Sequence, residues 1–256
     1  MLYPMLWTIS NSFKSGANIL GKPSSLTPEF YDLRNYVSVF QTAPFDLYII
    51  NSIITALVIV FSQVLLSSLM AFGFTYFKFK GRNILYGAVI GTLMIPAAIT
   101  YVPSYILISR MNLLNTLFGV IISNVVNVAT IFYLVQIFKG VPKEMLEAAE
   151  IEGANKWQVY YKVVLPYTRS SIFTAGLISF IQNYNNYLWP SLITNSQSNM
   201  LVSQGLNALY TIDGNFTGNI PIIMAANVVV IIPLIVIYII FQKRFVVGVS
   251  NSGVKN

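Results

Sequence analysis

The chain has 256 residues, of which 55% are hydrophobic and 9% are charged, and its formal net charge is +7. Soluble domains carry about 25% charged residues, so this composition favours an integral membrane protein. Basic loops are common in membrane proteins, and the positive charge therefore does not indicate a nucleic-acid partner. The chain lacks Cys and His, which excludes Cys/His zinc sites, disulfides, histidine proton relays and histidine-dependent catalytic triads.

The N-terminal residues 1–13 are apolar but too few to cross a bilayer, which takes a helix of about 20 residues. They look like the outer half of a first helix. We favour a start codon assigned too late over a first helix that is short by nature. No cleavable signal peptide is evident, because the first residues lack a basic stretch and a small-residue cleavage site.

Five longer segments without charged residues predict five full spans. With the short first helix, they predict an all-α membrane protein, a bundle of six transmembrane helices in a single domain, residues 1–256. The prolines in the second segment either kink their helix toward a cavity or are simply tolerated. The segments are residues 47–77, residues 83–109 with Pro96 and Pro103, residues 111–138 with an apolar core from 116, residues 170–193, and residues 214–242 with a core from 221.

Lys and Arg residues predict the orientation of the chain, because cytoplasmic loops carry an excess of them. The segment 194–220 has none and is expected to be an external loop. The loop 139–169 and the C-terminus are expected to be cytoplasmic, in a multi-pass protein of a prokaryotic plasma membrane. One side holds Lys78, Lys80, Arg82, Lys139, Lys143, Lys156, Lys162, Arg169, Lys243, Arg244 and Lys255, and the other holds Lys14, Lys22, Arg34 and Arg110.

The cytoplasmic loop 139–169 concentrates acidic residues in an otherwise apolar chain. Val141-Pro142 predicts a helix start, because proline suits a first turn and the acids after it suit the positive end of the helix dipole. A Glu152–Lys156 ion pair is expected at i,i+4, and Leu165-Pro166 is expected to end the helical pattern. Four of the eight acidic residues of the chain lie here: Glu144, Glu147, Glu150 and Glu152.

Ala149, Gly153 and Trp157 are predicted to share one helical stripe, at i, i+4 and i+8, that another backbone could approach closely. Three interpretations of this loop stay open: an amphipathic helix on the membrane surface, a paired-carboxylate active site, or a docking helix for a cytoplasmic partner. The residues alone favour the surface helix over docking, and either over catalysis. The carboxylates lie in a wet loop without a nucleophile or a metal-ligand set.

The same loop resembles the signature of the membrane subunits of ABC importers. That signature is E-A-A, three residues, G, nine residues, a branched apolar residue, any residue and L-P. This chain has Glu147-Ala148-Ala149, Gly153, Val163 and Leu165-Pro166 at the same spacing. Further matches resemble the carbohydrate-uptake branch, in particular the maltose-type second permease subunit: Pro4, Trp7, Ser12-Phe13-Lys14, Asn51-Ser52, Met94-Ile95-Pro96, Leu188-Trp189-Pro190 and Gly205-Leu206.

The resemblance implies a type I permease fold in which a coupling helix docks on a cytoplasmic ATPase subunit. It implies these partners: a homologous second permease, two ATPase subunits, an external sugar-binding protein, a carbohydrate and membrane lipid, without nucleic acid. The external loop would help to empty the binding protein, and Gly253, Val254 and Lys255 would contact the ATPases, the alternative being a disordered tail. The coupling residues it implies are Glu147, Ala148, Ala149, Glu152, Gly153, Leu165 and Pro166.

No cofactor is expected on this chain, and ATP with Mg²⁺ would belong to the partner ATPases. The segment "GANILGKP", residues 16–23, almost fits the phosphate-loop pattern G-x-x-x-x-G-K-[ST]. However, Pro23 replaces the hydroxyl residue that binds magnesium, and no strand precedes the segment. No catalytic or metal-ligating residue is expected, and the chain is not expected to be an enzyme.

Amide and aromatic side chains in the fourth full span match the hydroxyls and the C–H faces of a sugar. The family pattern is roughly W-N-D-F-L-W-P, whereas this chain has Tyr184 for the Trp and Asn186 for the acid. For any single one of these residues, interhelical hydrogen bonding or an interfacial belt is slightly favoured over direct sugar contact, and the same holds for Asn124, Asn127 and Asn227. The candidate pathway residues are Asn183, Tyr184, Asn185, Asn186, Tyr187 and Trp189.

The sequence thus predicts a carbohydrate permease of an ABC importer that works by alternating access. One alternative keeps the class and changes the cargo to a polyamine, an amino acid or an anion. A membrane-embedded enzyme would need ionisable residues within the spans, which are almost absent. A self-sufficient channel is the third alternative.

Overall fold

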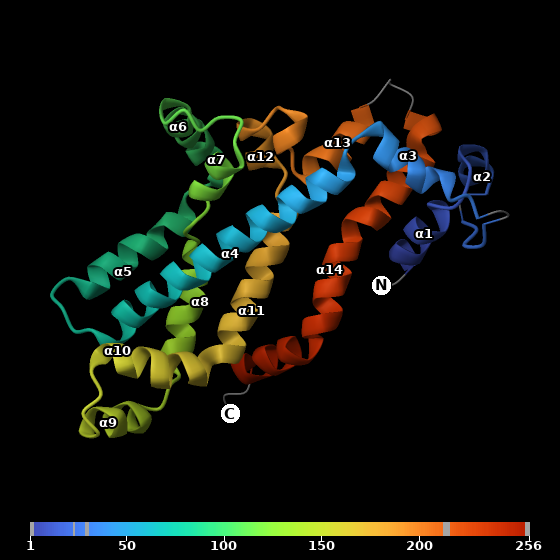
Figure 1. The fold of residues 1–256 in the computed structure, drawn as a ribbon. Helices are drawn as coiled ribbons and strands as arrows, with labels where there is room; N and C mark the ends of the chain where they lie inside the picture. The colour runs from blue at the N-terminus through green and yellow to red at the C-terminus, as the bar shows by residue number, and fades with distance from the viewer. Residues whose placement is uncertain (1–2, 23, 29–30, 212–215, 254–256) are drawn as a thin grey trace. The chain divides into compact units, whose positions relative to one another are not determined.

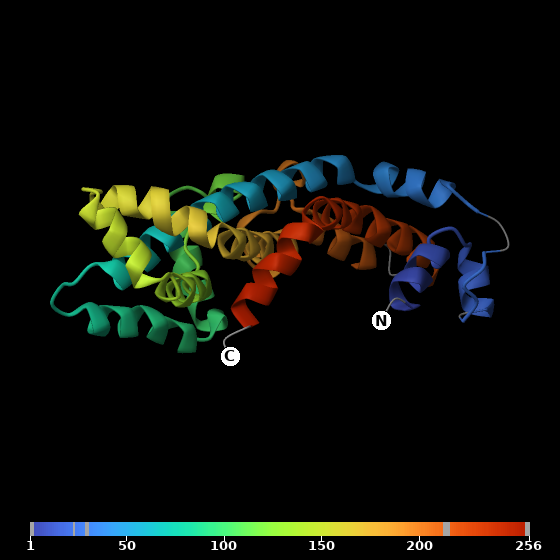
Figure 2. The same cartoon turned by 90° about the horizontal axis from the view of Figure 1, so that it is seen from below.

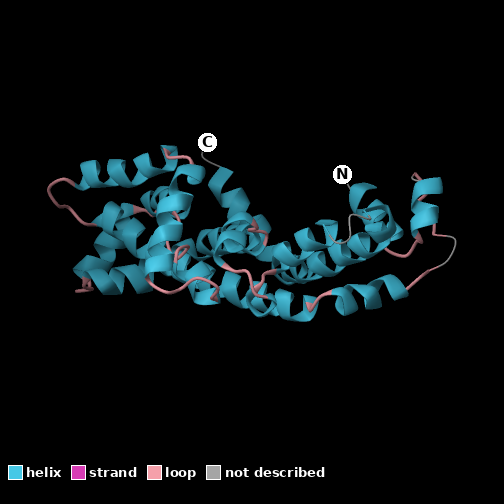
Figure 3. Cartoon of the chain, turned by 90° about the horizontal axis from the view of Figure 1, so that it is seen from above, coloured by secondary structure: helices cyan, strands magenta, loops and turns pink. Residues whose placement is uncertain are grey.

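The computed structural model describes residues 3–22, 24–28, 31–211 and 216–253, and every regular element in these ranges is a helix (Figures 1 and 3). The prediction of an all-α fold is confirmed. The helices are α1 Tyr3–Asn11, α2 Gly16–Gly21, α3 Arg34–Thr42, α4 Phe45–Tyr76, α5 Arg82–Gly91, η1 Thr92–Met94, α6 Ala97–Arg110, α7 Leu117–Ile122, α8 Val128–Lys139, α9 Lys143–Ile151, α10 Lys156–Gln158, η2 Val159–Val164, α11 Leu165–Tyr184, α12 Leu188–Ile193, η3 Gln197–Asn199, α13 Val202–Thr211 and α14 Phe216–Gly253.

Two described helices are long and apolar enough to cross a membrane alone, α4 and the part Asn219–Gln242 of α14. Helices α5 and α6 can form a third span as a pair, bent by 100° at the break between them. Pro96 lies at that break and precedes the first residue of α6, whereas Pro103 lies inside α6. Of the two prolines, only Pro96 therefore marks the bend.

Three predicted segments differ from the structure. Residues 111–138 are not one helix, because Asn127 caps α8 by accepting a hydrogen bond from the Thr130 backbone nitrogen at 3.1 Å. Residues 170–193 are interrupted after Tyr184, where α11 ends. The predicted external loop 194–220 contains η3, α13 and the first residues of α14. Hydrophobic runs therefore locate apolar segments but not the polar side chains that interrupt their helices.

The chain divides into two compact units. The first unit comprises Met1–Ile54, Asn115–Leu117 and Tyr184–Ile239, and the second comprises Thr55–Leu114, Phe118–Asn183 and Ile240–Asn256. In the second unit, α5 packs on α8, and α9 and α10 pack on the π-helical segment η2. Figure 2 shows α8 and α11 nearly end-on, so these two helices run close to parallel.

The core of the second unit joins α4, α8 and the segment from η2 to α11. Phe72 of α4 stacks on Tyr160 with ring centroids 5.0 Å apart, and Ser68 shares a buried hydrogen bond of 2.7 Å with the Tyr160 hydroxyl. Tyr76 donates to the carbonyl of Phe138 at 2.8 Å. The fully enclosed members of this core are Ala71, Ile131, Leu134, Phe138 and Val164.

In the first unit, Gly205 of α13 lies directly against the ring of Tyr48, which is only 2% exposed. A Cβ at position 205 would fall far inside van der Waals contact with that ring. Close approach between α13 and α4 therefore requires glycine at this position.

Gly205→Ala should destabilise the protein by about 1–3 kcal/mol, because the added methyl group overpacks the Tyr48 contact. Thermal unfolding of the detergent-solubilised protein should show a lower midpoint. Gly73→Ala is the matched control, since an added Cβ there meets nothing within 4 Å and Ala is about 1 kcal/mol better than Gly in a helix. Equal thermal unfolding midpoints for Gly205→Ala and Gly73→Ala would contradict the close packing of Gly205 against Tyr48.

Candidate functional site

Helix α9 begins where the sequence predicted, directly after Val141-Pro142. Val141 is buried in the core of the second unit, and Pro142 occupies the N-cap position with φ −57°. Glu144 lies in the first turn, where its charge favours the positive end of the helix dipole. The start of α9 is therefore anchored to the core on one side and stabilised electrostatically on the other.

The two faces of α9 differ in chemistry. Leu146 and Ala149 pack against the core of the second unit, while Glu147, Ala148 and Glu150 are exposed. The small Ala149 side chain lets the α9 backbone lie close to its own core. The exposed face then offers carboxylates and one small residue to whatever contacts it.

Helix α9 ends at Ile151 with Glu152 as its C-cap, and the next residue, Gly153, has φ +84°. The Gly153 backbone nitrogen donates to the Glu150 carbonyl at 3.0 Å, and the Ala154 nitrogen donates to the Ala149 carbonyl at 2.9 Å. This pair of bonds is a Schellman cap, and its left-handed residue is usually glycine because other residues are strained there. The predicted single stripe through Ala149, Gly153 and Trp157 is wrong, because the chain turns at Gly153 and starts a new helix.

The new helix, α10, has its own cap. The Asn155 side chain accepts from the Gln158 nitrogen at 2.9 Å, and the Gln158 side chain accepts from the Asn155 nitrogen at 2.7 Å. Lys156 forms an ion pair with Glu150 across the turn. The predicted Glu152–Lys156 pair is wrong, because the turn at Gly153 brings Glu150 rather than Glu152 to the lysine.

The expected helix end at Leu165-Pro166 is also wrong, since α10, η2 and α11 follow one another without a gap. Residues Val159–Val164 are π-helical, and Pro166 occupies the first turn of α11. Proline lacks a backbone donor and clashes with the carbonyl four residues earlier, so it fits only where the regular α-helical pattern is interrupted. The segment from α10 through η2 therefore continues directly into the long helix α11.

Two large apolar side chains near the turn are exposed: Ile151 is 87% and Trp157 is 65% accessible. Sequence reasoning missed Ile151 as a surface residue, although an isoleucine between four carboxylates is a recognisable signal. Large apolar side chains that are exposed and rimmed by polar groups are typical of a surface that a protein partner covers. Figure 1 shows α9 and α10 at the end of the second unit where the α4–α5 turn also lies.

The candidate pathway residues separate into two groups. In the second unit, the Asn183 side chain donates to the Ser179 carbonyl at 2.8 Å. In the first unit, the buried Tyr184 donates to the Val230 carbonyl at 3.0 Å, and Trp189 is buried. These contacts favour the structural interpretation for Asn183, Tyr184 and Trp189. Likewise Asn124 and Asn227 donate to carbonyls within their own segments.

Of the other candidates, Asn185 and Tyr187 line a hollow of about 270 Å³ within the first unit, whereas Asn186 does not. Tyr187 donates to the Asn207 side chain at 3.0 Å, and the Asn186 carbonyl accepts from Ser203 at 2.7 Å. Sequence reasoning missed the contribution of α13, although Val202, Leu206 and Leu209 have helical spacing. The hollow is lined by Tyr184, Asn185, Tyr187, Val202, Ser203, Leu206, Asn207, Tyr210 and Val230.

The segment before α13 is tied down by polar side chains of the first unit. Asn51 donates to the carbonyls of Ser198 and Met200 at 2.9 and 3.1 Å, and Ser52 accepts from the Val202 nitrogen at 2.8 Å. Asn115, which the sequence did not single out, accepts from the backbone nitrogens of residues 195 and 196 at 3.1 and 3.0 Å.

The predicted contact of the C-terminal tail with the ATPases involves residues at the end of the described chain. Gly253 is the last residue of α14, and Val254 and Lys255 lie outside the described residues.

Comparison with known proteins agrees with this architecture. The chain is 31% identical to the arabinooligosaccharides transport system permease protein AraQ of Halalkalibacterium halodurans, over 99% of this chain and 91% of that protein. It is 30% identical to the diacetylchitobiose uptake system permease protein NgcG of Streptomyces coelicolor, over 98% and 83% respectively. A crystal structure of a bacterial ABC transporter that imports the acidic polysaccharide alginate shares the fold, with a TM-score of 0.83 at 23% identity, over 95% of this chain and 90% of that one.

The family comparison covers most of the chain and includes both the α9 turn and the apolar helices around it. Residues 63–251 match the family described as binding-protein-dependent transport system inner membrane component. The chain therefore belongs to the family of inner-membrane permease components of binding-protein-dependent transport systems.

Proposed function

We propose that this chain is the permease subunit of an ATP-driven importer for a carbohydrate. Its partners would be a second permease, two ATPase subunits and an external binding protein. The observation that carries this proposal is the α9 turn, a helix that is capped at both ends, seated on the core and exposed along a face of carboxylates and alanine. The carbohydrate is supported by two of the relatives, whose names specify transport of arabinooligosaccharides and uptake of diacetylchitobiose.

In this proposal α9 is the coupling helix. Glu147, Ala148 and Glu152 would contact the ATPase, and Gly153 would keep the turn compact. The inner side of α9, at Leu146 and Ala149, rests on the core that holds the end of α4. A push on α9 would therefore move packed side chains rather than bend a loop, because protein cores are close-packed and resist compression.

ATP would be bound by the partner subunits and not by this chain. The segment that resembles a phosphate loop supports this, because Gly16–Gly21 forms the helix α2, with Ser15 as its N-cap. In a phosphate loop those residues would form an open loop that precedes a helix.

The α9 turn and the C-terminus would face the cytoplasm of a prokaryotic cell. The basic residues support this orientation, because those of the α4–α5 turn lie at the same end of the second unit as α9 (Figure 1). The segment with α13 would face the external binding protein, and Gly253 to Lys255 would approach the ATPases.

The hollow beside α13 would be part of the sugar pathway, with Asn185, Tyr187 and Asn207 as its polar contacts. Amides and tyrosine hydroxyls both donate and accept hydrogen bonds, which matches sugar hydroxyls. No charged side chain is among its described lining residues. A polyamine or an anion would require a countercharge there, so the lining favours a neutral polyol over the alternative cargoes.

The cargo is tested by the ATPase activity of the assembled complex with its binding protein. Arabino-oligosaccharide, chitobiose, glycerol 3-phosphate and spermidine are added separately, because they differ in charge. We expect one of the neutral saccharides to stimulate ATP hydrolysis, since the uncharged lining favours it. Stimulation by spermidine or glycerol 3-phosphate alone would overturn the carbohydrate proposal and keep the importer.

Substitutions at Gly153 separate backbone strain from docking. Gly153→Ala should cost about 1–2 kcal/mol because of the positive φ, whereas Asn and Asp tolerate that conformation better. An added Cβ meets nothing within 4 Å in this chain, so Gly153→Asn and Gly153→Asp should insert into the membrane normally. Both should reduce sugar uptake, because the added side chain weakens the contact between the turn and the ATPase, whose affinity falls about tenfold for each 1.4 kcal/mol of docking free energy lost. Normal uptake by Gly153→Asp would count against docking.

Glu147 and Glu144 form a matched pair on α9, since both are exposed carboxylates. Glu147→Gln should lower sugar-stimulated ATPase activity, because truncating one member of a charge pair that becomes buried in the complex costs about 2–5 kcal/mol. Glu144→Gln should lose only the helix-dipole contribution of about 0.3–1 kcal/mol and remain nearly as active. Equal activity of the two variants would contradict the role given to Glu147.

A further inference from the structure

The turn between α4 and α5 combines basic and aromatic residues at the edge of an apolar span. Helix α4 ends at Tyr76, and the chain continues as Phe77-Lys78-Phe79-Lys80-Gly81 before α5 starts at Arg82. Gly81 has φ +83°, which lets the chain reverse within a few residues. Both flanking helices belong to candidate spans, so the turn lies where a membrane ends.

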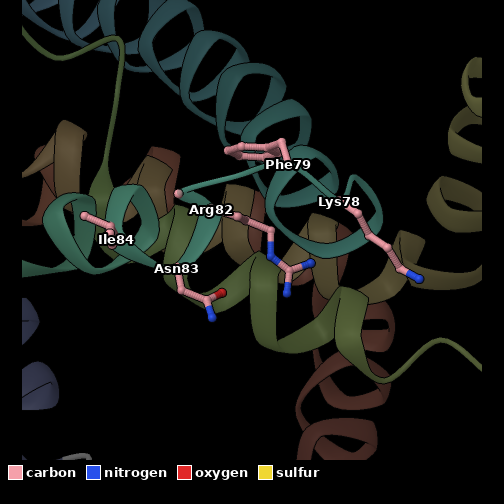
Figure 4. A pocket seen from close by; sticks show the side chains of 6 residues that line it. Lys78, Phe79, Arg82, Asn83 and Ile84 are labelled. Carbon is pink, nitrogen blue, oxygen red and sulfur yellow. The ribbon is translucent and has the colours of Figure 1, made fainter.

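A hollow of about 480 Å³ opens at this turn (Figure 4). In Figure 4 the polar ends of Lys78, Arg82 and Asn83 extend to one side of the turn, and the Phe79 ring lies on the other. The hollow is lined by Lys78, Phe79, Gly81, Arg82, Asn83 and Ile84.

The two cations of the hollow are not neutralised within the described part of the chain. The ion pairs found there are Arg34–Asp32 and Lys156–Glu150. Arg82 makes a long hydrogen bond of 3.4 Å to the Phe77 carbonyl, which leaves most of its five donors for another acceptor. The hollow therefore has a net positive charge and spare donors, and it suits an anion.

The rim of the hollow is apolar. Ile84 is 80% exposed, and Phe77, Phe79 and Leu85 are each exposed by more than two fifths. Aromatic side chains at such positions prefer the boundary between headgroups and acyl chains. A free phosphate ion makes no use of these surfaces, whereas a phospholipid covers them with its acyl chains.

We infer that the α4–α5 turn binds the phosphate headgroup of an anionic phospholipid, with Lys78 and Arg82 as the cationic contacts and Asn83 as a neutral donor. Basic residues directly beside a span attract anionic lipid, and a guanidinium can bind a phosphate through two parallel donors. The inference goes beyond the proposed function, since it depends on the membrane location of the family and not on the cargo or the coupling helix.

The test uses the assembled importer in bilayers with photoactivatable phosphatidylglycerol or phosphatidylcholine of identical acyl chains. Crosslinks to the peptide 77–85 are quantified by mass spectrometry. A basic residue near the surface favours anionic lipid by about fivefold, so phosphatidylglycerol should label this peptide at least that much more than phosphatidylcholine. Equal labelling of the wild-type protein by the two lipids would overturn the inference without any variant.

The matched variants are K78Q/R82Q and K80Q, because Lys80 lies in the same turn but does not line the hollow. K78Q/R82Q should remove most of the preference for phosphatidylglycerol, whereas K80Q should lower it by no more than the about fivefold effect of one surface charge. An equal loss in K80Q would reduce the effect to general surface charge and refute the site. Suppression by inorganic phosphate at constant ionic strength would show a site for soluble phosphate, and this outcome would also refute the lipid.

Co-purification of the ATPase subunits with each variant verifies that it has folded and assembled. The single variant K78Q replaces the double variant if assembly fails. A failure of sugar-stimulated ATP hydrolysis would affect the proposed function alone, because the lipid test needs neither ATP nor sugar.

Discussion

Backbone groups in an apolar environment must find hydrogen-bond partners within the protein, and this constraint governs the structure. Helices satisfy it without help, which is why the described chain is helical throughout its regular parts. Where a helix ends, a polar side chain forms hydrogen bonds with the backbone groups that the helix leaves unpaired. At the start of α8, the Asn127 side chain accepts a hydrogen bond from the Thr130 backbone nitrogen. Gln63 of α4 donates to the carbonyl of Asn124 at 2.7 Å. Isolated polar residues in apolar segments therefore mark the helix breaks.

The same need to pair backbone groups determines the structure of the turn between α9 and α10 in the second unit. The α9 turn is closed by its own backbone at Gly153 and restarted by Asn155, so its polar groups do not depend on a partner. Tyr160 then joins this segment to α4 through one ring contact and one hydroxyl contact. The shape of this segment is therefore set by its own contacts, and it joins an exposed helix to buried ones.

Sequence patterns predicted the elements that depend on local signals. The long apolar helix α4, the start of α9 after Pro142 and the membrane character of the chain all follow from composition, capping and hydropathy. Features that depend on tertiary contacts were not predictable. Asn115 looks like an ordinary turn residue, yet its side chain accepts hydrogen bonds from two backbone nitrogens about 80 positions away in the sequence. Pro166 signals a helix end by itself, but the π-helical turn before it removes the conflict.

The candidate site shows the same division. Spacing identified Glu147, Ala148, Ala149 and Gly153, and the structure adds which of them face the core. Sequence spacing could not identify the ion-pair partner of Lys156, because the left-handed backbone at Gly153 changes the direction of the chain. In the first unit, the aromatic and amide residues after Asn183 were visible in the sequence. Their neighbours Asn207 and Tyr210 lie in the uncharged segment that forms α13, and the sequence alone does not show that this segment packs beside them.

The positions of the four carboxylates distinguish helix stability from docking. Glu144 stabilises the positive end of α9, and Glu150 is paired with Lys156. Glu152, in contrast, is the C-cap residue of α9, at the negative end of the dipole, where a carboxylate costs about 0.3–1 kcal/mol. Glu147 is exposed, and no described ion pair includes it or Glu152. The stability of α9 therefore accounts for Glu144 and Glu150 but not for Glu147 and Glu152. A cationic partner surface would account for both of these, and it would bind a helix whose shape the other two have already secured.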